Sequence, residues 1–272
     1  ITDAISAHIA AQMFEGLVMF SPNDLSVQPC LAESWEIDSA MTTYTFRLKK
    51  GVFFHDDLCF AGGKGREVRA QDIVFTFEQA CTMSPENSSF SATLKDKVAG
   101  ANEYYEASAK GKPAFALAGI KALDDYTVQI RLIRPLVNFL YTLANTALSV
   151  MPREALDKSG SLARVGTGPF CFGEERTSPE AIVLKRNPAY HGRDNFGNRL
   201  PFLDSLVFYF MGSQQKELGA FKKGDLDIIT RIPAESVKQE VIGNIRAFRD
   251  KPVQYILERS PELSTQYYTL IN

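Results

Sequence analysis

The chain has 272 residues, of which 45% are hydrophobic, so it can bury a sizeable core, and its length predicts one large or two modest domains. Its 30 basic and 32 acidic side chains give a net charge of −2, which excludes the basic surface of a typical nucleic-acid-binding protein. The sequence contains no apolar run of the roughly 18–20 residues that a membrane-spanning helix needs.

Both ends of the chain fall inside regular patterns. Ile5, Ile9 and Met13 recur every four residues, which predicts a helix over residues 1–17. The last residues, "QYYTLIN" (266–272), are typical of a strand that is cut at its end. We therefore expect the chain to be a fragment of a longer protein.

The first half of the sequence alternates strands, loops and helices. Residues 43–54 alternate apolar and polar side chains, which predicts a strand buried on one face. A glycine-rich loop follows over 55–68, and 69–81 has the spacing of an amphipathic helix with Asp72 in its first turn. Residues 82–112 are polar, and this composition indicates irregular turns and a helix.

A hairpin is predicted next. Residues 119–132 contain two alternating segments with Asp124 and Asp125 at the turn between them. Pro135 ends the second strand, and 136–148 has the pattern of a helix.

The stretch "VGTGPF" (165–170) is a strong turn signal, because glycine reaches positive φ freely and proline restricts the residue before it. It predicts a turn ahead of a strand at Cys171 and Phe172. A phosphate-binding loop would need a following Lys-Ser/Thr pair or a third glycine at a helix start, and neither is present. Nucleotide binding is therefore not expected here.

The last third of the sequence has the texture of an α/β layer. A short strand is predicted over 181–190, and the apolar run 203–211 indicates a strand covered on both faces. A helix over 213–225 and another buried strand over 226–233 would complete a βαβ unit.

No metal or catalytic site is expected. The cysteines lack a Cys-x-x-Cys spacing, so we expect them to be mostly unpaired, although three pairings are possible. His55, Asp56 and Asp57 could form an acid–base or metal site, but adjacent strand residues point to opposite faces, so a solvated strand end is favoured. The sequence has no G-x-S-x-G or H-E-x-x-H motif, and we expect no enzyme activity and no cofactor.

Eight motifs together resemble one family. They occur in the order and approximate spacing of the extracellular solute-binding proteins of ABC importers, in the class for oligopeptides, dipeptides and nickel that is called family 5. The motifs are "FEGLV" (14–18), "LAESWE" (31–36), "YTFRLKKGVFFHDD" (44–57), "AQDIVFTFE" (70–78), "GIKALDDYTVQIRL" (119–132), "GTGPF" (166–170), "VLKRNPAYHG" (183–192) and "FKKGDLDI" (221–228).

The resemblance implies a fold and a domain organisation. Members close a second lobe over the ligand, so this chain would be the first lobe of a two-lobed cluster C binding protein, with a type II periplasmic-binding-protein-like fold. The lobe would be an α/β domain made of 1–28 and 150–272, interrupted by an α+β insertion over 29–149, and the second lobe would be absent. The GTGPF turn would then mark the return of the chain into the α/β domain.

Two residues depart from the family pattern. Members usually have glycine at the position of Asp57, and threonine at the position of Arg69, where it caps the next helix. A lost threonine cap typically costs about 1 kcal/mol, so we expect the helix that starts near residue 70 to find another cap.

The family also implies where a ligand lies. Its peptide is extended between the lobes and pairs with main-chain groups in the manner of an added strand. By resemblance the first lobe contributes Glu15, Gly16, Leu17, Val18 and Met19. Glu15 could face a peptide ammonium, or it could be a helix-end carboxylate bonded to nearby backbone. Leu17 and Met19 could instead be simple core residues.

Phe90 is a further candidate for the wall of the ligand site, with packing in a satellite core as the alternative. The resemblance implies a protein that binds peptides outside the inner membrane, in the periplasm or extracellular space, and delivers them to ABC permease subunits. The full-length protein could be tethered by a lipid anchor. Two other functions stay open: the ligand-sensing domain of a transcriptional regulator, and an extracellular hydrolase, against which the missing catalytic motifs argue.

Overall fold

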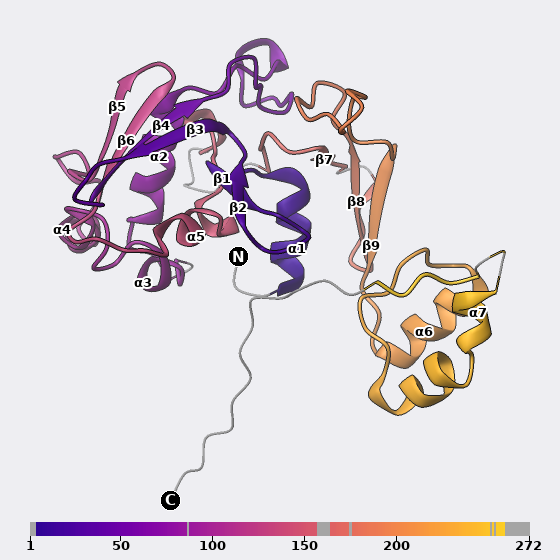
Figure 1. The fold of residues 1–272 in the computed structure, drawn as a ribbon. Coiled ribbons are helices and arrows are strands. Elements are labelled where there is room, and N and C mark those ends of the chain that lie inside the picture. The colour runs from indigo at the N-terminus through magenta and orange to yellow at the C-terminus, as the bar shows by residue number, and fades with distance from the viewer. Residues whose placement is uncertain are drawn as a thin grey trace, which may run out of the picture. The chain divides into compact units, whose positions relative to one another are not determined.

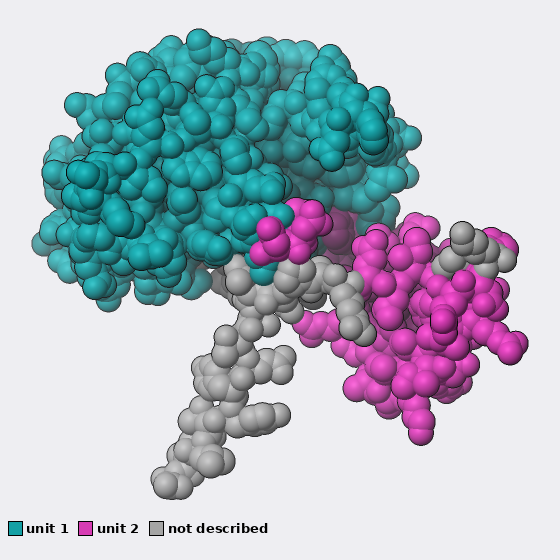
Figure 2. Space-filling model, viewed as in Figure 1, with its two compact units in different colours: residues 1–21, 25–176, 183–207 teal, residues 22–24, 177–182, 208–272 magenta. Residues whose placement is uncertain are grey.

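The computed structural model (Figure 1) describes residues 4–85, 87–156, 164–173, 176–250, 252 and 254–258. The chain forms two compact units, shown in Figure 2. Unit 1 consists of 1–21, 25–176 and 183–207, and unit 2 consists of 22–24, 177–182 and 208–272. The division into 1–28 plus 150–272 and an insertion over 29–149 stays a prediction.

Unit 1 begins with the predicted helix, α1 (Ala4–Met13). The chain then enters a small two-stranded antiparallel sheet of β1 (Val18–Phe20) and β2 (Val27–Pro29). In this pair Val18 lies opposite Pro29. The segment between α1 and β1 contains Glu15, Gly16 and Leu17, and β1 contains Val18 and Met19, which are ligand-contact residues that the family resemblance implies.

A four-stranded antiparallel sheet forms the centre of unit 1. Its strand order is β3 (Ala32–Ile37), β4 (Thr43–Leu48), β6 (Thr127–Arg131) and β5 (Ile120–Asp124). The predicted strand within 43–54 and the predicted hairpin of β5 and β6 are both confirmed. The predicted helix also forms as α2 (Ala70–Ala80), which contacts β5 and β6. The core between the helix and the sheet is fully buried and includes Phe46, Ile73, Phe77, Val128 and Ile130.

Short helices surround this core. The polar segment 82–112 contains α3 (Phe90–Thr93) and α4 (Ala101–Ser108), as its composition indicated. The helix predicted over 136–148 is shorter than expected: α5 spans Phe139–Leu143, and a 3-10 turn follows over Thr146–Leu148. The Asn145 side chain explains the break, because it accepts the Ala147 N–H (2.9 Å) and caps the second turn.

The strands after the GTGPF turn form a three-stranded sheet in the order β7 (Phe170–Phe172), β8 (Ala181–Arg186) and β9 (Ser205–Tyr209). β7 and β8 are antiparallel, with Phe170 opposite Arg186. All three strands lie where the sequence predicted strands. β9 is not covered on both faces as its apolar run indicated, because Tyr209 is exposed.

The predicted βαβ unit is wrong. Its helix forms as α6 (Gln214–Lys223), capped by Ser213 and ended by Gly224 in the left-handed conformation. The segment 226–233 forms no strand, and Ile228 is 80% exposed. An apolar run indicates that burial would be favourable, but a strand also needs a partner to pair with, and this segment pairs with none of the described strands.

The remaining described elements of unit 2 are short helical turns. They are a 3-10 turn over Ala234–Ser236, a π-helical turn over Lys238–Ile242 and α7 (Ile245–Arg249). Two further 3-10 turns, Ala61–Gly63 and Arg153–Ala155, belong to unit 1. The strand predicted over 266–272 lies outside the described residues. Among the helices that are described, none is long and apolar enough to cross a membrane.

Candidate functional site

The GTGPF turn packs directly against the end of α1. A Cβ added to Gly166 would lie 2.1 Å from the Met13 carbonyl oxygen, and one added to Gly168 would lie 2.6 Å from the Met13 carbonyl carbon. The Gly168 N–H donates to that same carbonyl oxygen (2.9 Å). Neither glycine has a positive φ. The predicted turn before a strand is confirmed, but the glycines serve close backbone approach, so the expected conformational reason is wrong.

His55 holds the other side of this turn. Its Nδ1 accepts the Gly166 N–H (3.3 Å), and its Nε2 lies 2.9 Å from the Gly168 carbonyl oxygen. Because an amide N–H only donates and a carbonyl only accepts, the ring is neutral with its proton on Nε2. Burial lowers the pKa of His55. The expected solvated strand end is therefore wrong for His55, whereas Asp56 is exposed and pairs with Lys64 (2.7 Å).

A buried carboxylate lies next to the turn. Glu15 Oε2 accepts from the Thr167 hydroxyl (2.8 Å) and lies 2.9 Å from His191 Nε2. Its Oε1 accepts from the Tyr190 hydroxyl (3.0 Å) and lies 3.6 Å from the Cys30 sulfur. Burial and the Glu15 carboxylate raise the pKa of Tyr190, so the phenol stays protonated and donates. We call Glu15, Thr167, Tyr190 and His191 the Glu15 cluster.

The Glu15 cluster joins three of the sequence motifs. Glu15 belongs to "FEGLV", Thr167 to "GTGPF", and Tyr190 and His191 to "VLKRNPAYHG". Asn187, from the last of these motifs, is also buried and donates to the Gly168 carbonyl oxygen (3.0 Å). The motifs were visible in the sequence, but their meeting at one carboxylate was not, because the partners lie more than 150 residues away from Glu15.

The partners of Glu15 are side chains, and not the nearby backbone that one sequence alternative expected. Gly16 lies close to other backbone, since an added Cβ would be 3.2 Å from the Leu143 carbonyl oxygen. Leu17 and Val18 are buried core residues, whereas the side chain of Met19 is 44% exposed. Contact of these residues with a ligand stays a prediction.

Phe90 lies apart from the Glu15 cluster in sequence and in contacts. It is buried at the start of α3, and its ring stacks on Tyr105 of α4 with centroids 4.0 Å apart and planes at 2°. Phe90 belongs to the main hydrophobic core of unit 1, so the expected satellite core is wrong, and its role toward a ligand stays a prediction.

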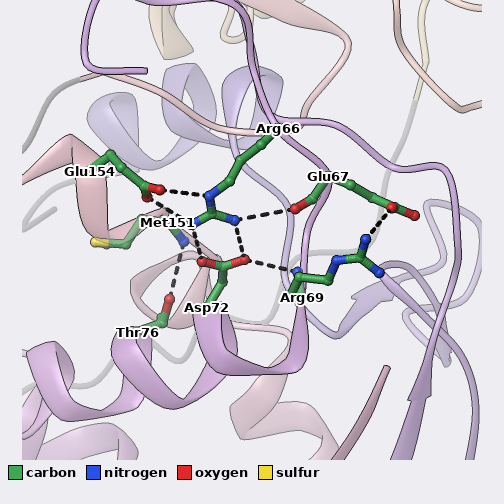
Figure 3. Close-up of polar contacts among 7 residues, drawn as sticks. All are labelled: Arg66, Glu67, Arg69, Asp72, Thr76, Met151 and Glu154. Carbon is green, nitrogen blue, oxygen red and sulfur yellow. Dashed lines mark hydrogen bonds and ion pairs between the residues drawn. The ribbon is translucent and has the colours of Figure 1, made fainter. Parts of the chain in front are cut away.

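An arginine-centred network, shown in Figure 3, joins the glycine-rich loop to the start of α2. The Arg66 guanidinium donates to both carboxylate oxygens of Asp72 (2.7 and 2.8 Å) and to both of Glu154 (2.7 Å each). This pairing with Arg66 lowers the pKa of Glu154. One turn further along α2, the Thr76 hydroxyl accepts the Met151 N–H (3.1 Å).

The same network supplies the missing helix cap. Asp72 Oδ2 accepts the Arg69 backbone N–H (2.8 Å), which is one half of a capping box. The Arg69 guanidinium carries only N–H donors, so it cannot accept a helix N–H as a threonine hydroxyl would. It instead pairs with Glu67 (2.8 Å) and lies over the Tyr126 ring (4.4 Å). The expectation that α2 finds another cap is confirmed.

The cysteines form no disulfide. All four are free, as expected from their spacing. Burial raises the pKa of Cys171 to about 11 and that of Cys81 to about 12, so these thiols stay protonated near neutral pH. Across the described ranges, no group of three or more His, Cys, Asp or Glu side chains is placed to hold a metal ion.

Comparison with known proteins identifies the family. Residues 26–272 match the family described as bacterial extracellular solute-binding proteins, family 5 Middle. The chain belongs to this family. Its members bind solutes and are not enzymes, which confirms the expectation that the chain has no enzyme activity.

Two relatives and one solved structure show the extent of the similarity. The chain is 31% identical over 227 residues to the dipeptide-binding protein of Escherichia coli, which covers 80% of the chain and 38% of that protein. It is 30% identical over 226 residues to the heme-binding protein A of Haemophilus influenzae, which again covers 80% of the chain and 38% of that protein. Each match thus spans well under half of the relative.

The solved structure is the periplasmic binding protein DppA of Helicobacter pylori in complex with the peptide STSA. It matches with a TM-score of 0.71 and 27% identity, covering 88% of this chain and 44% of that one. The match confirms the predicted mixed α/β fold of the periplasmic binding proteins.

Proposed function

We propose that this chain is the first lobe of a peptide-binding protein of an ABC importer. The observation that carries the proposal is the similarity, over 88% of the chain, to a solved binding protein that holds a peptide. The full-length protein would capture peptides outside the inner membrane, in the periplasm or extracellular space, and deliver them to permease subunits. A lipid anchor could hold it at the membrane.

The contacts inside unit 1 support the proposed lobe organisation. The strands of the central sheet all come from 32–131, which fits an inserted domain. In contrast, the Glu15 cluster joins residue 15 to residues 167, 190 and 191, which fits an α/β lobe whose two pieces lie on either side of the insertion.

The residues predicted to contact the peptide lie on and just before β1. β1 pairs only with β2 among the described strands, so no described strand occupies its second edge, where main-chain pairing with an extended peptide would take place. We assign this pairing to Gly16 and to Leu17, Val18 and Met19, with the exposed Met19 side chain facing the ligand. Glu15 would act by fixing this segment through the Glu15 cluster, and Phe90 would contribute a more distant wall.

The proposal is tested by ligand binding to the full-length protein. Calorimetric titration would use peptides of two to five residues, with haem as a competitor of different chemistry because one relative is a heme-binding protein. Binding of peptides and not of haem supports the proposal. Binding of haem alone, or of neither, overturns it.

A further inference from the structure

A pocket of about 360 Å³ opens between the loop before α3 and the helix α4 of unit 1. α3 and α4 are marked in Figure 1. We call this the α3–α4 pocket, and its lining includes Ser88, Phe90, Ser91, Lys95, Tyr105 and Glu106. None of these residues belongs to the Glu15 cluster or to the Arg66 network. Its volume is at the lower end of the range for small-molecule pockets, which suits a ligand of the size of an amino acid or dipeptide.

The wall of the α3–α4 pocket is preformed. The parallel stack of Phe90 and Tyr105 gives it a flat aromatic surface. The loop before α3, which also lines the pocket, is fixed by Asn87, whose Nδ2 donates to the Ala80 (2.9 Å) and Thr82 (2.8 Å) carbonyl oxygens. The Met83 N–H also donates to the Ser108 hydroxyl on α4 (2.7 Å). A ligand would therefore meet an ordered surface and would not have to organise one.

The rim of the pocket carries one cation and one anion that are not paired. Neither the Lys95 ammonium nor the Glu106 carboxylate forms a hydrogen bond or ion pair with another residue that the structure describes. Their neighbours differ: Lys97 bonds to the Ala92 carbonyl oxygen, and Asp96 accepts from Asn102 (2.6 Å). The pocket thus combines an aromatic wall with two unmatched charges of opposite sign.

We infer that the α3–α4 pocket binds a small zwitterion with an apolar side chain, of the class of an amino acid or dipeptide. The ligand carboxylate pairs with Lys95, its ammonium pairs with Glu106, and its side chain lies against Tyr105. The hydroxyls of Ser88 and Ser91 are additional hydrogen-bonding groups on the lining. This inference goes beyond the proposed function, because the site lies wholly within unit 1 and needs no second lobe.

The first test separates the two charges of the ligand. The isotope-labelled chain is titrated with glycyl-phenylalanine by NMR, alongside its N-acetyl form, its C-terminal amide and the form blocked at both ends. The free dipeptide should bind most tightly, with shifts at the amides of Ser88 and Tyr105. Each block should weaken binding about fivefold, the size of one exposed charge pair. No saturable shifts at these amides, or equal binding of all four forms, would overturn the inference.

The second test assigns each charge to a residue. In Lys95→Met, amidation of the ligand should no longer weaken binding, and in Glu106→Gln, acetylation should no longer weaken it. The matched controls are Lys110→Met and Glu103→Gln, which change exposed charges on or beside α4 that do not line the pocket. If the pocket variants behave like the controls, the inference is wrong. Loss of peptide binding by the full-length protein is a separate result that bears only on the proposed function.

Discussion

The two units bury their apolar residues to very different degrees. Unit 1 has a continuous core that runs from Leu17 to Val165. In the described part of unit 2, the only buried hydrophobic residues are Ala181, Leu218 and Ala247. Its exposed large hydrophobic residues are Tyr209, Phe210, Ile228, Val237, Ile242, Ile245, Ile256 and Leu257. Apolar residues in a sequence can therefore form a closed core or a surface that favours further contacts.

The largest difference between the units should appear on truncation of a core side chain. Phe46→Ala removes a fully buried ring from the central sheet and should cost about 3–5 kcal/mol of unfolding free energy. Ile228→Ala in unit 2 should change it by less than about 0.5 kcal/mol, because the side chain is exposed. Urea unfolding followed by the fluorescence of Trp35, the single tryptophan, reports on unit 1. Backbone hydrogen exchange in each unit is measured as well. If Phe46→Ala and Ile228→Ala changed the urea transition equally and accelerated exchange in their own units equally, the two units would not differ in how they bury apolar residues.

The next effect concerns the buried charge in unit 1. Arg66→Met removes both bonds to the buried Asp72 carboxylate and should cost about 2–3 kcal/mol. Lys64→Met, which breaks the exposed pair with Asp56, should cost less than about 1 kcal/mol. Urea midpoints of the two variants measure this difference. Adding Asp72→Asn to Arg66→Met should recover part of the loss, and no recovery would mean that the unpaired charge is not its cause.

The third effect concerns the close packing of the GTGPF turn against the end of α1. Gly166→Ala places a methyl group against the Met13 backbone, and the resulting displacement should cost about 1–3 kcal/mol. Thermal unfolding of this variant measures the loss. A substitution without effect would mean that the turn can move away from α1 freely.

Part of this fold and of the candidate site could be predicted from the sequence. The central hairpin, α2 and the strand after the GTGPF turn follow from local alternation, helical spacing and turn residues, and they form where expected. The strand over 226–233 is wrong because apolar content alone does not determine whether a segment pairs with another strand. The burial of His55 and the Glu15 cluster depend on partners more than 100 residues away, for which a single sequence carries no local signal. Tyr190 and His191, two polar aromatic residues in the turn that follows β8, were the nearest available hint.

The pH dependence of the unfolding free energy should report on the burial of the neutral His55 ring. Burial lowers the folded pKa of His55 below its unfolded value of about 6.5, so the unfolded chain binds more protons as the pH falls through that value. The contribution of the neutral ring is therefore fully present above about pH 7 and is lost on acidification. Urea unfolding between pH 7.5 and 5.5, compared with His55→Gln, should show a shallower pH slope in the variant, by up to about 1.4 kcal/mol per pH unit. Parallel slopes would show that His55 does not titrate between the two states.

The smallest expected effect has the opposite sign and lies in unit 2. Gly219 is inside α6, and an added Cβ would meet nothing within 4 Å. Gly219→Ala should therefore stabilise the helix by about 0.5–1 kcal/mol. Slower backbone hydrogen exchange in α6 is the measurement. Faster exchange would mean that α6 gains nothing from the higher helix propensity of alanine at residue 219.

Peptide binding at the β1 segment needs a lobe beyond this chain. Calorimetric titration of one peptide series against the full-length protein and against this chain, each carrying Lys95→Met and Glu106→Gln so that the α3–α4 pocket does not contribute, measures this need. A peptide held by one lobe keeps its outer edge in water, and losing about 4 kcal/mol of contacts moves a micromolar site to about the millimolar range. We expect micromolar binding by the full-length variant and no binding tighter than about millimolar by the corresponding variant of this chain. Micromolar binding by that variant of this chain alone would mean that the peptide site lies within a single lobe.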